Sequence, residues 1–190
     1  MVHEHIYNRK SIVCFDEKPV PPQVLKDIFE AASLAPSANN QQPWRYLVGV
    51  KGTTTYTKIF DSLKEGNQEW AGKAPVLIAS IAEVVSSYNR KTNIHAWHDT
   101  ALSFSNLIFE ATSRDLFVHP MAGFYSENLI SAFKIPIDFQ PVVVAAIGYR
   151  GDCKDMSESI RQRENKQRIR KPLDEFIFDN EWGKSFKFKV

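Results

Sequence analysis

The sequence predicts a single α+β domain of 190 residues, in which a mixed β-sheet is flanked by helices. A chain of this length can bury a substantial core, and its 43% hydrophobic and 24% charged residues are typical of a globular protein. Predicted helices and strands interleave with few continuous strand–helix–strand units, which argues against a doubly wound dinucleotide fold. No GxGxxG motif follows a predicted strand either, so we expect no dedicated site of that kind for a dinucleotide.

The first half of the chain is expected to hold two helices with a strand between them. Two prolines at 21–22 can begin a helix, residues 24–32 carry apolar side chains at helical spacing, and Pro36 ends the pattern. Residues 46–50 alternate as a short strand does, and helical spacing returns over residues 56–63.

The second half is expected to hold two buried strands, residues 76–81 and 142–147, and a long helix from Trp97 to Arg114. This helix is apolar around much of its circumference, which is typical of a helix buried in a core or against another subunit. Ser126 can cap a shorter helix that follows it. The tail, about residues 178–190, ends in apolar residues that alternate with lysines and should pack on a partner chain: Phe186, Phe188 and Val190.

Composition excludes several classes of protein. The formal charge of +2 is too small to mark a nucleic-acid binder, and the longest apolar run, residues 141–148, is too short to span a bilayer. No signal peptide is recognised, and Cys14 and Cys153 lack CxxC spacing, so we expect free thiols in a cytoplasmic protein. His95 and His98 share a helix face, but no third ligand is evident, and no metal site is expected.

Two segments carry groups suited to a phosphorylated, planar ligand. Arg9-Lys10-Ser11 offers a guanidinium and a hydroxyl that can bind phosphate oxygens, although such tripeptides are more often solvated surface. Residues 35–44, Ala-Pro-Ser-Ala-Asn-Asn-Gln-Gln-Pro-Trp, join a helix to a strand and are dense in amides and hydroxyls. An Asx-rich turn beside a core tryptophan is the alternative interpretation of this segment.

The order of these motifs resembles the nitroreductase-like flavoproteins. The same order continues through four further segments: Gly66–Trp70 with Ala74-Pro75 behind it, Pro120–Phe124, the Pro141–Tyr149 strand and Arg168–Leu173. The resemblance covers nearly the whole chain, and several pieces in the correct order make a chance agreement improbable.

The resemblance implies an FMN cofactor bound between two subunits of an intertwined homodimer. The implied residues fall into three groups. Arg9, Lys10, Ser11, Arg168 and Arg170 surround the phosphate; Pro36, Ser37, Ala38 and Asn40 line the flavin from the other subunit; Asn67 meets the pyrimidine edge, and Pro120, Met121, Ala122 and Gly123 run beside the ring. Backbone groups near glycine can approach a flavin closely.

The implied activity is a ping-pong reaction in which NADH or NADPH reduces the flavin and a small electrophilic acceptor, such as a nitroaromatic or a quinone, reoxidises it. The flavin carries the chemistry, so no catalytic side chain is required. Trp70, Phe124 and Tyr125 are expected to shape the pocket. Cys14 is a poor nucleophile candidate, because an apolar setting raises the pKa of a thiol.

Two departures from the family pattern concern the flavin's pyrimidine edge. Val13 and Trp70 stand where family members often carry basic residues, which stabilise the reduced flavin. Lys64, Lys73 or the partner's tail could supply the charge instead. Two alternatives stay open: another flavin chemistry on the same fold, such as dehalogenation or flavin fragmentation, and a flavin-binding or flavin-sensing protein with little turnover.

Overall fold

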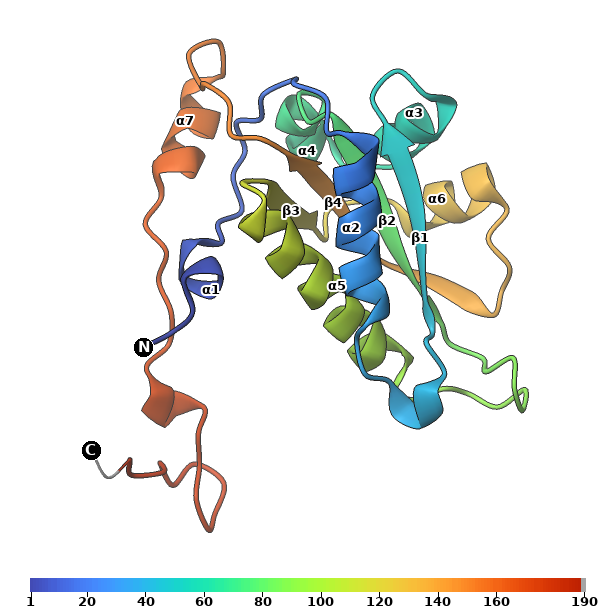
Figure 1. Ribbon diagram of the computed structural model, residues 1–190, viewed down its shortest axis with the longest axis vertical. Coiled ribbons are helices and arrows are strands. Elements are labelled where there is room, and N and C mark those ends of the chain that lie inside the picture. The colour runs from blue at the N-terminus through green and yellow to red at the C-terminus, as the bar shows by residue number, and fades with distance from the viewer. Residues whose placement is uncertain (189–190) are drawn as a thin grey trace.

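A four-stranded sheet lies between two layers of helices in the computed structural model, which describes residues 1–188 (Figure 1). The strand order is β1-β2-β4-β3, and all three neighbouring pairs are antiparallel. The strands are β1 (Trp44–Val50), β2 (Val76–Glu83), β3 (Phe117–Met121) and β4 (Phe139–Gly148). The α+β class is confirmed, but the sheet within residues 1–188 is antiparallel throughout rather than mixed as predicted.

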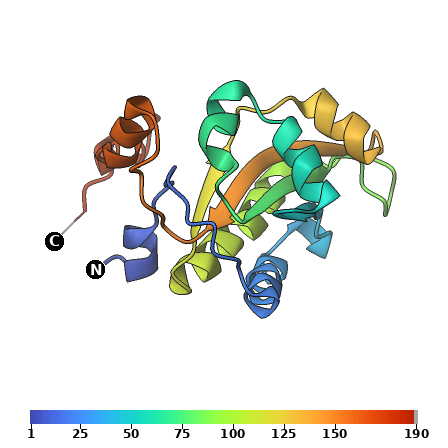
Figure 2. The same cartoon turned by 90° about the horizontal axis from the view of Figure 1, so that it is seen from above.

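The helices divide between the two faces of the sheet (Figure 2). Helices α2 and α5 cover one face, and α3, α4 and α6 cover the other. The helical segments are α1 (Glu4–Asn8), α2 (Pro22–Ser33), η1 (Ala38–Asn40), α3 (Thr54–Asp61), α4 (Glu65–Ala71), α5 (Ala96–Ser113), α6 (Ser126–Phe133), α7 (Glu158–Asn165) and η2 (Leu173–Glu175). None of these helices has the length and hydropathy that a bilayer span requires.

Strand β2 is buried on both faces, because each helical layer covers one set of its alternating side chains. Leu77 and Ala79 join the core cluster under α3, α4 and α6, whereas Val76 and Ile78 join the cluster under α2 and α5. This two-sided burial explains why the strand reads as a continuous apolar run.

The long helix α5 buries only one side in this chain. Phe104, Leu107 and Ala111 pack in the core, while Trp97 on the outer side is 48% exposed. Its apolar outer surface is therefore available to another chain. Helix α6 corrects a smaller prediction: Ser126 is its first residue, Tyr125 holds the N-cap position, and no side chain caps the helix.

The prediction of free thiols is wrong, because Cys14 and Cys153 form a disulfide with Cα atoms 5.4 Å apart. The chain returns from β4 alongside residue 14, where Gly151 N donates to Cys14 O at 2.9 Å. The bridge closes a sequence separation of 139 residues. Sequence spacing could not reveal this contact, since antiparallel alignment of two distant segments creates it.

Beyond α7 the chain leaves the sheet and descends beside α1 (Figure 1). Trp182 is 93% exposed, with Phe178 as its aromatic neighbour at 5.0 Å between ring centroids. Phe186 and Phe188 contact each other and are also exposed, whereas Val190 lies outside the described residues. The predicted packing of this tail on a partner stays a prediction.

Candidate functional site

Three arginines converge where the tail passes α1. Arg9, Arg168 and Arg170 line a cavity of about 350 Å³, together with Tyr7 and Phe109. Arg168 donates to Arg9 O at 3.0 Å and to Tyr7 O at 2.7 Å, which holds the tail against the N-terminal segment. The structure therefore brings together three of the residues that the sequence assigned to a phosphate.

The cluster carries uncompensated positive charge. Burial, followed by repulsion from Arg170 and Arg168, lowers the pKa of Arg9 below its usual value. None of the three guanidinium groups forms an ion pair with a carboxylate within residues 1–188. Arg9 Nη1 donates to Ser11 Oγ at 3.2 Å, so the serine also faces the cluster. Such a group of cations is suited to an anion with several acceptor oxygens.

Lys10 is directed away from this cluster. Its Nζ donates to the backbone oxygen of Glu164 and lies 3.5 Å from the Oε1 of the same residue. The expected place of Lys10 beside the phosphate therefore differs from the structure, which uses the lysine to hold α7 against the N-terminal segment.

Asn67 and Gly123 come into direct contact at the helical layer formed by α3, α4 and α6. Asn67 Nδ2 donates to Gly123 O at 2.9 Å, and Lys64 N donates to the same oxygen at 3.0 Å. A Cβ at position 123 would lie 2.7 Å from Asn67 Nδ2, so this approach requires glycine. The structure thus brings the predicted Pro120–Gly123 segment, which leaves β3, to the predicted amide in α4.

Of the two lysines named as replacement cations, Lys64 fits better. It adjoins the Asn67–Gly123 contact, and its Nζ lies 5.6 Å from the Tyr125 ring centroid. Lys73 Nζ instead lies 3.6 Å from a carboxylate oxygen of Glu17.

Val13 and Trp70 are core residues, 1% and 0% exposed. Trp70 packs in the core cluster with its ring centroid 4.4 Å from that of His119. A fully buried indole offers no surface to a ligand, so the expectation that Trp70 shapes the pocket is wrong.

His119 was missed by sequence reasoning, and a lone histidine in a strand gives no signal. Its Nδ1–H donates to Ile12 O at 2.6 Å, and its Nε2 accepts from Arg163 at 3.3 Å. Burial is the main cause that lowers the pKa of His119 to about 4. The charge of Arg163 also lowers this pKa, whereas the hydrogen bond to Ile12 O raises it. Neutral His119 therefore joins β3, the N-terminal segment and α7.

The predicted Pro36–Asn40 segment forms a rigid polar turn at the end of α2. Asn39 and Asn40 adopt positive φ angles of 50° and 53°, which asparagine tolerates. The carboxylate of Asp99 accepts from Ala38 N at 2.9 Å and so anchors the turn to the start of α5.

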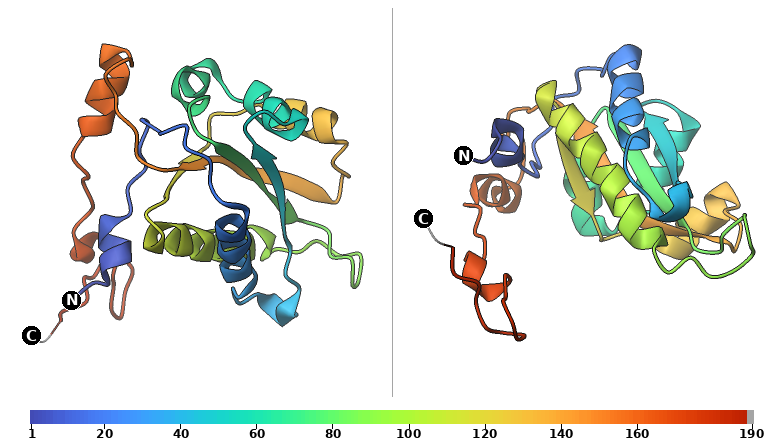
Figure 3. Two further views of the ribbon diagram at one scale, coloured as in Figure 1. Left: turned by 45° about the horizontal axis from the view of Figure 1, so that its top comes forward. Right: turned by 60° about the horizontal axis from the view of Figure 1, so that its bottom comes forward.

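This turn lies far from the other groups within one chain. Helix α5 runs from the turn to the arginine cluster (Figure 3), and Asp99 and Phe109 on it are separated by a rise of about 15 Å. Asn67 belongs to α4, in the helical layer on the other face of the sheet from α5, and Gly123 contacts it from the loop after β3. The predicted flavin wall therefore does not meet the predicted flavin edge inside a single chain.

A polar cavity of about 620 Å³ lies beside the turn, between Asn39–Gln41 and Glu83–Asn89. Ser86 lines it and is 4% exposed, and its Oγ has no hydrogen-bond partner among the described residues. Glu83 in the same wall pairs with Arg45 at 2.9 Å. The amide side chains of Asn39, Asn40, Gln41 and Asn89 make this wall of the cavity polar.

The fold is an antiparallel sheet between two helical layers. Within residues 1–188 the arginine cluster has no carboxylate partner, and the Asn67–Gly123 contact lies at the end of β3. The nitroreductase family model matches residues 6–54 and 49–149, and the chain belongs to the nitroreductase family. The predicted family is confirmed.

Two relatives and one solved structure illustrate the similarity. An uncharacterised 15.4 kDa protein of Mycolicibacterium smegmatis is 33% identical over 73% of this chain and 97% of its own length. An Archaeoglobus fulgidus protein, described as a candidate NADH dehydrogenase/NAD(P)H nitroreductase, is 25% identical over 86% of this chain and 93% of its own length. The crystal structure of an oxidoreductase containing FMN superposes with a TM-score of 0.88 at 28% identity, covering 96% of this chain and 93% of the other. The fold and the oxidoreductase class agree with the sequence predictions.

Proposed function

We propose that this chain is a cytoplasmic, homodimeric, single-domain FMN oxidoreductase that uses NADH or NADPH to reduce nitroaromatic, quinone or related electrophilic acceptors. The observation that carries the proposal is the arginine cluster, which has no acidic partner among the described residues and is therefore suited to a multiply charged anion. The FMN in the similar oxidoreductase structure supports the choice of ligand.

The residues fit the phosphate end of FMN. Arg9 and Arg170 would donate to the phosphate oxygens, and Ser11, already in contact with Arg9, would add a hydroxyl donor. Two N–H groups of Arg168 donate to backbone oxygens, so its main role is to hold the tail in place.

The residues also fit the ring end. FMN, when bound, supplies the hydride chemistry by accepting reducing equivalents from the nicotinamide and passing them to the acceptor. Asn67 and the backbone of Pro120–Gly123 would orient the ring, since they already lie together at the end of β3. Lys64 would place a positive charge near the ring and so favour its reduced, anionic form.

A partner chain would complete this site. The turn after α2, which holds Pro36, Ser37, Ala38 and Asn40, lies away from α4 in one chain (Figure 1), so the turn of one subunit would cover the flavin of the other. The exposed outer face of α5 and the exposed aromatic tail offer apolar surface that a two-fold dimer would bury twice.

The test of the cofactor is an absorption spectrum of the purified protein, followed by release and identification of its chromophore. We expect FMN, and steady-state oxidation of NADH or NADPH when a quinone is added. A purified protein that neither contains nor binds FMN would remove the proposal. Bound FMN without turnover would favour the flavin-binding or flavin-sensing alternative.

A second chemistry has a specific observation in its favour. Iodotyrosine deiodinase 1 of Rattus norvegicus is 25% identical over 54% of this chain and 45% of its own length. Product analysis with a halogenated phenol and with a nitroaromatic, under the same reductant, distinguishes dehalogenation from nitro reduction.

Dilution tests the shared site. If the turn of the partner covers the flavin, subunit dissociation and flavin release should occur over the same concentration range. Sedimentation and flavin fluorescence measure the two events. A monomer that retains FMN with undiminished affinity contradicts the division of the site between chains.

A further inference from the structure

The Cys14–Cys153 disulfide joins the two segments that supply the arginine cluster. Cys14 follows the N-terminal segment that carries Arg9, and Cys153 precedes α7, which leads to Arg168 and Arg170. We call residues 153–170 the arm. The disulfide is at the start of the arm, and the two arginines are at its end.

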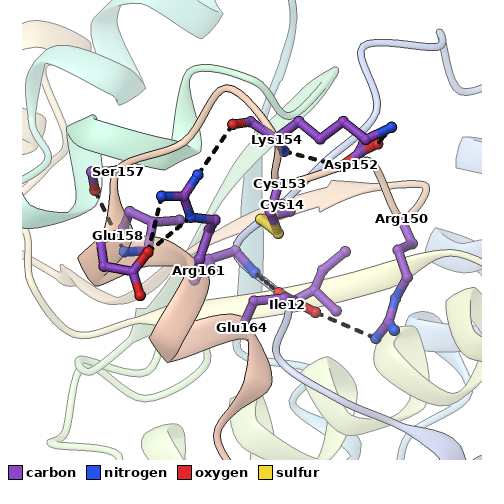
Figure 4. The surroundings of a disulfide bond; sticks show 12 residues. Ile12, Cys14, Arg150, Asp152, Cys153, Lys154, Ser157, Glu158, Arg161 and Glu164 are labelled. Atoms are coloured by element: carbon purple, nitrogen blue, oxygen red, sulfur yellow. Dashed lines mark hydrogen bonds and ion pairs between the residues drawn. A yellow bond between two sulfur atoms is a disulfide. The ribbon is translucent and has the colours of Figure 1, made fainter.

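Glu164 lies between the disulfide and the arginines. Its Oε2 accepts from Val13 N at 2.7 Å, and its Oε1 lies 3.5 Å from both Lys10 Nζ and Arg150 Nη2 (Figure 4). A carboxylate oxygen of Glu164 and both sulfurs lie within 4.8 Å of one another. The disulfide therefore holds the arm beside the N-terminal segment in the position where the Glu164 carboxylate, 8% exposed, contacts Val13 N, Lys10 and Arg150.

Several non-covalent contacts also attach the arm to the rest of the chain. Ile160 and Met156 pack in the core, and Arg163 donates to His119 and lies over the Trp70 ring. Ser157 Oγ donates to Glu69 Oε1 at 2.5 Å, and Arg168 donates to Arg9 O and Tyr7 O. Helix α7 is otherwise polar, with Arg161 paired to Glu158 on its own surface. A segment with so little buried apolar surface depends strongly on a covalent attachment.

The disulfide can be reached from outside. A cavity of about 250 Å³ opens beside it, with Cys14, Phe15, Gly151 and Met156 among its lining residues. Cys14, which lines the cavity, is only 2% exposed, and Cys153 is the more exposed residue of the pair.

We propose that Cys14–Cys153 is a redox-controlled clamp that sets the affinity of the arginine cluster for the phosphate of FMN. The proposal rests on the proposed function. A small dithiol drives the reduction: its thiolate attacks one sulfur, the S–S bond breaks, and a second exchange releases both cysteines as thiols. The reagent loses two electrons and two protons and becomes a disulfide. Disulfides of cytosolic proteins are usually catalytic or redox-sensing, which agrees with this role.

Reduction weakens phosphate binding through chain entropy. Once the disulfide is reduced, the hydrogen bonds of Arg168 to Arg9 O and Tyr7 O remain without the covalent link at the start of the arm. Arg168 and Arg170 then sample more positions, and FMN must order them when it binds. The Asn67–Gly123 contact lies outside the arm, in α4 and at the end of β3. The arm contacts these two elements through Ser157–Glu69 and Arg163–His119, whereas it carries Arg168 and Arg170 itself, so we expect its release to act on the phosphate end. The clamp therefore acts on FMN but not on riboflavin, which lacks the phosphate.

The experiment compares the affinity of the full-length apoprotein for FMN and riboflavin before and after treatment with dithiothreitol, with thiols counted to establish the redox state. We expect FMN to bind about tenfold more weakly after reduction, equivalent to re-ordering a single residue, and riboflavin to bind equally in both states. Equal FMN affinity in the two states, or an equal loss for riboflavin, overturns the clamp.

Two further measurements separate the clamp from the cofactor assignment. The Cys14→Ser/Cys153→Ser variant should behave as the reduced wild type and should not respond to dithiothreitol. Hydrogen exchange in residues 158–170 of the apoprotein should rise on reduction of the wild type. Failure of the oxidised protein to bind FMN would remove the proposed function, whereas unchanged exchange would overturn the clamp independently of any flavin.

Discussion

The arginine cluster makes a quantitative prediction about cofactor binding. Arg9→Ala and Arg170→Ala should each weaken FMN binding by about 1.5–3 kcal/mol, the range for a hydrogen bond to a charged group, which corresponds to about 10- to 150-fold in Kd. The double variant should lose less than the sum, because both residues address one phosphate.

The apoprotein should respond in the opposite direction. Arg170 lowers the pKa of Arg9 by repulsion, so removing Arg170 relieves that repulsion when no anion is bound. We therefore expect Arg170→Ala to leave the free energy of unfolding unchanged or slightly higher while FMN binding weakens. Loss of binding through unfolding would show the reverse pattern.

Fluorescence titration of the apoprotein with FMN and riboflavin measures the effect, and urea unfolding measures stability. Riboflavin affinity should not change, since only the phosphate is addressed. Arg161→Ala is the matched control, because Arg161 lies on the same arm but pairs with Glu158. Unchanged FMN affinity in both cluster variants, or an equal loss in Arg161→Ala, would refute the assignment.

Three other predictions concern the ring end, the buried histidine and the disulfide. Gly123→Ala should displace the Asn67 amide and weaken FMN and riboflavin alike in fluorescence titrations, whereas Gly66→Ala, with open space around its Cβ, should not. The pKa of His119 falls from 6.5 to about 4, so the unfolded state binds more protons and stability decreases as pH falls through this window, by up to about 3 kcal/mol. Urea unfolding of His119→Gln between these pH values should show a flatter dependence, and an equally steep one would contradict the assignment. Cys14→Ser/Cys153→Ser should lose about 2–5 kcal/mol of stability relative to the oxidised protein, a range typical for native disulfides, and an unchanged urea midpoint would contradict this.

The elements of the fold were largely predictable from the sequence. Strands β2 and β4 lie between two helical layers, so they need apolar side chains on both faces and appear as continuous apolar runs. Helix α5 packs one face against the sheet, so its apolar residues recur at helical spacing. These signals are local, because burial acts on each residue of a regular element at a fixed period.

The candidate site was predictable only as a set of separate segments. Motif order associated Arg9 with Arg170 and Asn67 with Gly123, and the structure brings the members of each pair together. Periodicity carried no information about Glu164, whose ion pair with Lys10 directs this lysine away from the arginine cluster. Long-range ion pairs depend on which surfaces face each other after folding.

Side-chain direction and covalent pairing were decided by the tertiary structure alone. The sequence comparison placed Val13 and Trp70 at the pyrimidine edge of the flavin only as an expectation from the resemblance. Both side chains point into the core, because the N-terminal segment packs across β3 and α4. Cys14 and Cys153 became a disulfide because the end of β4 returns beside residue 14. The sequence by itself determined which elements form and which chemical groups are available; the packing of segments more than a hundred residues apart decided which of those groups meet.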